Sequence, residues 1–82
     1  DLTLTLKKVY AESLYEDDSA TLDDLREAVT TLEDTTRIAQ RVFGASHPTT
    51  TGHEESLQNA RAALAARGVE ALGNALGALG AA

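Results

Sequence analysis

Residues 39–48, AQRVFGASHP, decide the fold because they end one helix, make a turn and lead into another helix. Gly44 follows the last apolar residue of a helical pattern, and glycine is favoured there because it adopts the left-handed conformation without steric cost. Pro48 disfavours the helical conformation of His47, so residues 45–50 are expected to form a loop. The stretch therefore predicts a helix that stops at Gly44 and another that begins beyond the His-Pro turn.

The helix that stops at Gly44 is predicted to span residues 22–43. Thr21 followed by Asp24 has the pattern of an N-cap with an acidic residue in the first turn, which is a helix start signal. Apolar or small side chains then recur at alternating short steps, as in the a/d seam of a coiled coil. These positions are Leu22, Leu25, Val29, Leu32, Thr36, Ala39 and Phe43. Such a seam suits antiparallel packing against a neighbouring helix.

A first helix is predicted over residues 4–15, and the acidic turn 16–20 joins it to the second. Apolar side chains on one face recur at helical spacing. This face holds Leu6, Val9, Tyr10, Ser13 and Leu14. Residues 2–6 also alternate apolar and polar side chains, as a strand does, but nothing later in the chain offers a partner strand. The helical interpretation is therefore preferred.

A third helix is predicted over residues 51–67, where Thr51 and Glu54 repeat the capping pattern. Its apolar face holds Leu57, Ala60 and Leu64. The predicted fold class is all-α, an antiparallel helical hairpin plus a third helix, in one module of residues 1–82. The side chains expected to hold the helices together are Leu6, Tyr10, Leu14, Leu25, Leu32, Phe43, Leu57 and Leu64.

Residues 68–82 form a tail rich in glycine, alanine and leucine. Four apolar residues in it keep helical spacing, namely Val69, Leu72, Leu76 and Leu79. Each glycine inside a helix costs about 1 kcal/mol relative to alanine, so the isolated segment is expected to be weakly helical. The tail is interpreted as a short helix that becomes ordered when it docks on a partner.

Several of these motifs follow the order of a known repeat. They are Tyr10-Ala11 and Leu14-Tyr15 in the first helix, Val42-Phe43-Gly44 at the end of the second, His47-Pro48 in the turn, and the threonines 49–51 after it. Over roughly residues 3–65 the chain resembles the tetratricopeptide repeat of the long-helix kind found in kinesin light chains. The resemblance implies stacked helix pairs that present a concave surface to a protein partner and carry out no chemistry.

Tetratricopeptide units stack, and about three or more copies are needed for stability, whereas this chain holds roughly one and a half. The chain also lacks methionine and starts at Asp1. We therefore expect a fragment or processed product that belongs to a larger chain or complex. The alternative is a small helical accessory subunit of a multi-protein assembly, ordered by its neighbours.

Composition excludes other classes of function. The net charge of −6 argues against nucleic-acid binding, which needs clustered Lys and Arg. No apolar run reaches the 18 or so residues of a membrane-spanning helix, because Glu70 and Asn74 interrupt the tail. With no cysteine there are no disulfides or thiolate metal sites, and the redox compartment stays undetermined.

The sequence carries no pattern of catalytic, cofactor-binding or metal-binding residues. His47 and His53 with Glu54 or Glu55 could make a weak divalent-metal site, but a turn histidine and a first-turn surface histidine are the preferred interpretation. An EF-hand that starts at Asp17 would need glycine at its sixth position, where Leu22 stands. No serine lies in a Gly-x-Ser-x-Gly elbow, and no phosphate-binding loop follows a strand.

Two surfaces are predicted to meet a protein partner. One is an acidic ridge on the second helix, formed by Asp23, Glu27 and Asp34, for which a solvated charged face is the simpler alternative. The other is the tail stripe of Val69, Leu72, Leu76 and Leu79. The function predicted from sequence is a non-catalytic interaction or scaffold module.

Overall fold

The computed structural model describes the backbone of residues 2–81 and the side chains of residues 2–69, 72, 73, 76 and 77. The described chain contains three helices and no strand. They are α1 (Leu2–Glu16), α2 (Leu22–Phe43) and α3 (Pro48–Ala81). The all-α class and the hairpin with a third helix are therefore confirmed, and the alternating residues 2–6 are helical.

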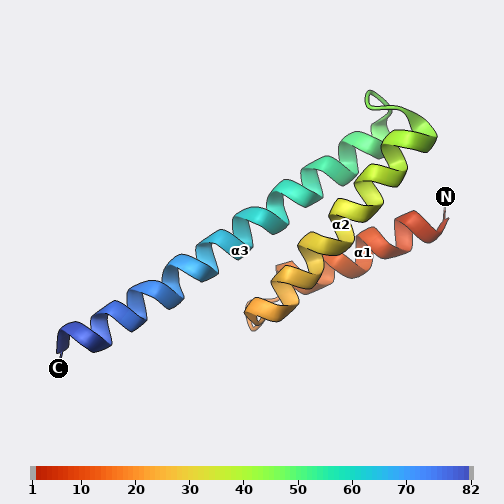
Figure 1. Ribbon diagram of the computed structural model, residues 1–82. Helices are drawn as coiled ribbons and strands as arrows, with labels where there is room; N and C mark the ends of the chain where they lie inside the picture. Colours follow the sequence, from red (N-terminus) through yellow and green to blue (C-terminus); the bar gives the residue numbers. More distant parts are fainter. Residues whose placement is uncertain (1, 82) are drawn as a thin grey trace.

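The helices form a flat, elongated body with one projecting end (Figure 1). α1 and α2 make an antiparallel hairpin, and α3 packs against α2 and also contacts α1. The molecule measures 54 × 20 × 14 Å. Since a helix rises about 1.5 Å per residue, the 34 residues of α3 span about 51 Å and set the long dimension. The C-terminal half of α3 extends beyond the hairpin.

α2 has the predicted bounds, and its caps explain them. Thr21 accepts a hydrogen bond from the backbone N–H of Asp24 at 3.1 Å, and the Asp24 carboxylate accepts one from the Thr21 N–H at 3.1 Å. This reciprocal capping box satisfies two N–H groups that the helix leaves free. At the other end, Gly44 has φ of 91° and donates its N–H to Gln40 at 3.0 Å. An L side chain would be strained at that φ value.

α3 differs from its predicted bounds at both ends. It begins at Pro48 rather than Thr51, because proline is tolerated in the first helical position and the His47 ring accepts a hydrogen bond from the Thr49 N–H at 3.1 Å. It also continues past Arg67 to Ala81 without a break. The glycines of the tail weaken the helix but do not end it, since alanine and leucine around them favour it.

The core lies where the three helices meet. Leu32 of α2 is fully buried and packs in a cluster with Ala11 of α1, with Ala28, and with Leu57 and Ala60 of α3. Alanines on three sides let the helix axes approach closely. The predicted burial of Leu25, Leu32 and Leu57 is confirmed, whereas Leu14, Phe43 and Leu64 are only partly buried.

The predicted buried face of α1 is wrong. Leu6, Val9 and Tyr10 are 60%, 55% and 49% exposed, whereas Leu4 and Ala11 are buried. Helical spacing fits both sets, because α1 carries apolar residues on two opposite faces. The prediction follows the face with the larger side chains, but the small Ala11 side chain permits the closer contact with α2.

Candidate functional site

The exposed face of α1 carries several large apolar side chains. Its large side chains are well exposed, and we call them the outer stripe. They are Leu2 (74% exposed), Leu6 (60%), Val9 (55%) and Tyr10 (49%). The stripe runs along the side of α1 opposite the buried Leu4 and Ala11. Clustered apolar side chains of this kind mark interaction surfaces more often than single exposed residues do.

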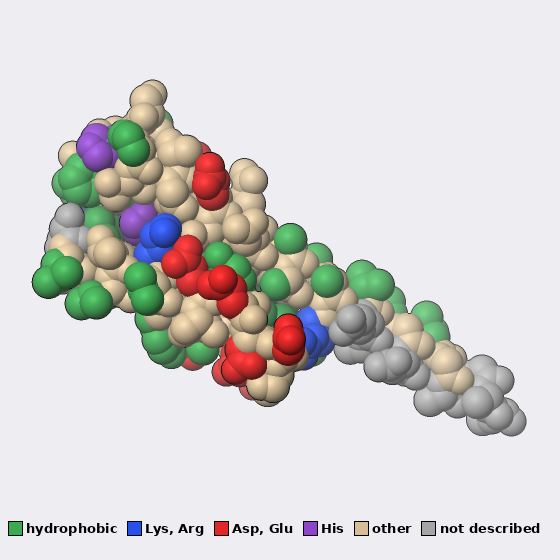
Figure 2. Space-filling view, turned by 180° about the vertical axis from the view of Figure 1, so that it is seen from behind, with side chains coloured by type: hydrophobic (Ala, Val, Ile, Leu, Met, Phe, Trp, Pro, Cys, Tyr) green, Lys and Arg blue, Asp and Glu red, His purple; other side chains and the backbone are tan. Residues whose placement is uncertain are grey.

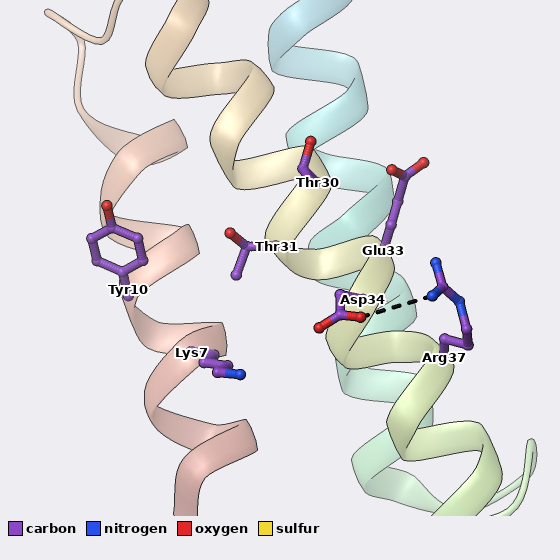
Figure 3. Close-up of a pocket in the computed structure, with 7 residues that line it drawn as sticks. All are labelled: Lys7, Tyr10, Thr30, Thr31, Glu33, Asp34 and Arg37. Atoms are coloured by element: carbon purple, nitrogen blue, oxygen red, sulfur yellow. Dashed lines mark ion pairs between the residues drawn. The ribbon is translucent and has the colours of Figure 1, made fainter.

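A groove lies beside the outer stripe, between α1 and α2 (Figure 3). It has a volume of about 600 Å³, and Tyr10 belongs both to its wall and to the stripe. The groove is lined by Lys7, Tyr10, Thr30, Thr31, Glu33, Asp34 and Arg37. The mixture of threonine, aromatic and charged side chains suits a polypeptide segment better than a small apolar ligand.

The predicted acidic ridge lies along this groove. Asp23, Glu27 and Asp34 are all exposed on one side of α2, and Asp34 lines the groove 3.8 Å from Arg37. The Tyr10 hydroxyl donates a hydrogen bond to the Glu27 carboxylate. That hydrogen bond, with the negative charge of Glu27, raises the pKa of Tyr10. The hydrogen-bond partner of Glu27 beside the outer stripe is thus a phenol hydroxyl and not a cation.

Acidic side chains are densest at the turn between α1 and α2. Residues 16–27 contain six acidic side chains and one basic side chain, a local net charge of −5 within the chain's −6. Hydrogen bonds from the Ser19 backbone and hydroxyl to Asp17 lower the pKa of that carboxyl group, so Asp17 stays ionised. Figure 2 shows acidic side chains gathered near the point where the projecting part of α3 leaves the body.

Arg67 holds this turn in place, a role that the sequence did not suggest. Its guanidinium donates hydrogen bonds to the backbone carbonyls of Ala20 and Asp18. Ala20 and Asp18 precede Arg67 by 47 and 49 positions in the chain, so no local sequence pattern predicts these contacts. From the sequence alone, Arg67 is predicted only to end the third helix.

The predicted tail stripe lies on the projecting part of α3. Val69, Leu72 and Leu76 are 69%, 60% and 58% exposed, and Leu79 lies outside the residues whose side chains are described. Gly73 and Gly77 have open space where a Cβ would stand. Apolar side chains and no charged ones are visible among the described atoms there (Figure 2). The tail stripe is separate from the outer stripe of α1.

Polar contacts fix α3 against the hairpin. His53 is buried rather than on the surface as predicted, with Nδ1 2.9 Å from the Thr49 carbonyl and Nε2 3.4 Å from the Leu4 carbonyl of α1. A neutral imidazole has one N–H and donates to one of these carbonyls at a time. Thr50 of α3 donates its hydroxyl to the Ala39 carbonyl of α2 at 3.2 Å.

Glu12 of α1 also joins α3. It accepts a hydrogen bond from Ser56 at 2.7 Å and pairs with Lys8 at 3.2 Å. Partial burial acts to raise the pKa of Glu12, but the Ser56 hydrogen bond and the Lys8 charge outweigh it and lower the pKa. The carboxylate is therefore ionised and structural at neutral pH.

The described residues contain no group of three or more His, Asp or Glu side chains that could hold a metal ion. His47 caps α3 and stacks on Phe43 with ring centroids 4.8 Å apart, whereas His53 is buried between α3 and α1. The two histidines thus have separate structural contacts. Among the described residues, no helix is both long enough and apolar enough to cross a membrane.

Comparisons of the chain with protein families, with curated proteins and with solved structures find no match in any of the three.

Proposed function

We propose that this chain is a non-catalytic protein–protein interaction module built from tetratricopeptide-like helical repeats. The order of the helices supports the proposal: α1 and α2 form a pair, and α3 contacts both of them, as the first helix of a following repeat would. Repeat proteins of this architecture bury their cores by stacking neighbouring units.

The outer stripe of α1 is the observation that carries the proposal. A helix with apolar side chains on opposite faces is typical of the interior of a larger packed array. Leu4 and Ala11 pack on one side of α1, while Leu2, Leu6 and Val9 remain exposed on the other. A partner that covers the stripe would remove this apolar area from water, which is the main favourable term in protein association.

The contacts of the titratable side chains Glu12 and His53 support a role without catalysis. Glu12 is engaged with Lys8 and Ser56, and His53 is packed between two carbonyl oxygens. The groove beside the outer stripe holds no histidine. Binding of a polypeptide segment is therefore better supported than an acid–base reaction.

Site-specific photo-crosslinking in the native cell tests the proposal. A photoreactive amino acid at position 6 or 9 is expected to crosslink the chain to one reproducible set of polypeptides. The same residue at Gln58, which is exposed on α3, serves as the control. If positions 6 and 9 give no adduct beyond that of Gln58, the chain does not bind a protein through this face and the proposal fails.

The projecting end of α3 favours a second candidate, an accessory subunit of a larger assembly. Its apolar Val69, Leu72 and Leu76 side chains lie away from the hairpin, where a neighbouring subunit could cover them. Removal of residues 69–82 is then expected to release the chain from its assembly. The crosslinks from positions 6 and 9 of the outer stripe are expected to be lost at the same time. If the truncated chain stays in its assembly and still crosslinks through positions 6 and 9, the interaction module alone is favoured.

A further inference from the structure

We infer that the element that occupies the outer stripe is an amphipathic helix of a partner protein, with an apolar stripe and a cluster of Lys and Arg at one end. The inference rests on the proposed function and names the partner's chemistry. Its apolar side would pack along α1, and its basic end would lie over the acidic turn between α1 and α2.

The shape of the surface favours a helix. Leu2, Leu6 and Val9 form a ridge with steps of four and three residues, which is the a/d spacing of a seam that packs against a neighbouring helix. The groove of about 600 Å³ lies beside this ridge, between α1 and α2. A helix placed over α1 would insert side chains into the groove, as amphipathic helices do in other helix-in-groove complexes. The described chain offers no strand edge to which an extended peptide could pair.

The charge distribution indicates where the basic end of the partner helix lies. Residues 16–27 carry a net charge of −5 near the C-terminal end of α1, and the Arg67 guanidinium on this turn offsets only one of these charges. Within this segment the exposed Asp23–Arg26 pair, at 3.3 Å, is an i,i+3 surface contact of little strength, and Glu27 bonds to a neutral hydroxyl. An arriving cation can therefore compete for Asp23 and Glu27, whose contacts are a weak surface pair and a neutral hydroxyl, whereas Lys7 lies nearer the other end of α1.

A second copy of this chain fits the surface less well. The last basic residue in the sequence is Arg67, and it is engaged with the acidic turn of its own chain. Beyond it, only Glu70 is charged, so the projecting end of α3 brings no cation to the acidic turn. The projecting end of a second copy therefore does not supply the basic end, and we assign the occupant to another protein.

Binding of two designed helical peptides to the 82-residue chain tests the inference. Both peptides are about 18 residues long, so that each spans about five turns, and both carry the same leucine stripe. One has three lysines at one end and the other has three glutamates there. Fluorescence anisotropy is expected to show at least about tenfold tighter binding of the lysine peptide at low salt, and a smaller ratio at high salt because screening weakens surface charge pairs. Equal affinities, or tighter binding of the glutamate peptide, would overturn the charge assignment.

Matched substitutions locate the site. Leu6→Asn is expected to weaken the lysine peptide about tenfold or more, whereas Leu72→Asn, at the same 60% exposure on the tail stripe, leaves binding unchanged. Circular dichroism of both variants checks that the helices remain folded. A loss confined to Leu72→Asn would place the peptide on the tail and overturn the inference.

Charge variants separate the turn from the general acidity of the chain. The pair Glu16→Gln and Glu27→Gln is expected to reduce the preference for the lysine peptide several-fold, while Glu54→Gln with Glu55→Gln, on α3 and outside the groove, reduces it less. An equal effect of both pairs would show that the turn has no special role. Failure of both peptides to bind, in a chain that still crosslinks through position 6, would overturn the helical partner but not the proposed function. Absence of crosslinks would remove the proposed function itself.

Discussion

Leu32→Ala is expected to remove a large part of the folding free energy of this chain. Leu32 is fully buried, and the substitution takes away three carbon atoms, worth about 2.4 kcal/mol in transfer free energy at about 0.8 kcal/mol each. The cavity left behind adds about 24 cal/mol per Å³. Because Ala11, Ala28 and Ala60 around it have no rotamers with which to fill the space, we expect a total of about 4 kcal/mol.

That loss is large against the stability available. At about 0.05–0.15 kcal/mol per residue, a chain of 82 residues has about 4–12 kcal/mol in total. Urea unfolding followed by far-ultraviolet circular dichroism is expected to show a much lower midpoint with the same slope. Leu6→Ala makes the same truncation at a side chain that is 60% exposed and is expected to cost below about 1 kcal/mol. If Leu6→Ala cost as much as Leu32→Ala, the assignment of the inner face of α1 would be refuted.

Three further substitutions test single contacts. Since the pKa of Glu12 is lowered in the folded chain, its carboxylate stabilises the fold above the unfolded pKa, and this contribution is lost as the pH falls through the folded pKa. Glu12→Gln should therefore lower the free energy of unfolding by about 0.5–1 kcal/mol at neutral pH. Urea titrations across pH should show that the difference from the parent chain vanishes in acid. Thr36→Val should raise the free energy of unfolding by about 1 kcal/mol, because the buried Thr36 hydroxyl has no hydrogen-bond partner; a destabilised variant would mean that the hydroxyl is satisfied. Gly73→Ala should slow amide hydrogen exchange in the distal part of α3, since alanine favours a helix by about 1 kcal/mol and nothing obstructs its Cβ; unchanged, coil-like exchange in both chains would contradict a continuous α3.

Local signals predicted α2 well because the contacts that define it are close in sequence. The Thr21–Asp24 box and the Gly44 cap act within a few residues of the helix ends. The third helix was harder, because glycine propensity alone suggested a break after Arg67. The energetic penalty of isolated glycines is about 1 kcal/mol each, which the flanking helix formers offset.

The candidate site was only partly predictable. Exposure of the acidic ridge and of the described tail stripe follows from the sequence pattern. Helical spacing alone, however, predicts a buried face with Leu6, Val9 and Tyr10 of the outer stripe, because both faces of α1 fit it. His53 was placed on the surface because its contact with the Leu4 carbonyl joins residues 49 positions apart. The contact of Arg67 with the acidic turn is not predicted for the same reason. Contacts of this kind depend on how α3 lies across α1, which no local pattern encodes.

The distribution of side-chain size links the fold to the proposed binding. The buried positions hold many alanines, whereas several of the largest apolar side chains remain outside. The alanines are Ala11, Ala20, Ala28, Ala39 and Ala60, and the exposed side chains include Leu2, Leu6, Val9, Leu72 and Leu76. Burial of a Leu or Val side chain contributes about 1.5–3 kcal/mol, so much of the hydrophobic free energy of this sequence is realised only when another surface covers α1 or α3. A ligand that binds only the folded state stabilises it in proportion to the logarithm of its concentration over Kd. Folding of this chain and occupancy of its outer stripe are therefore expected to form one coupled equilibrium, in which the partner supplies the apolar contacts that the alanine-rich interior does not.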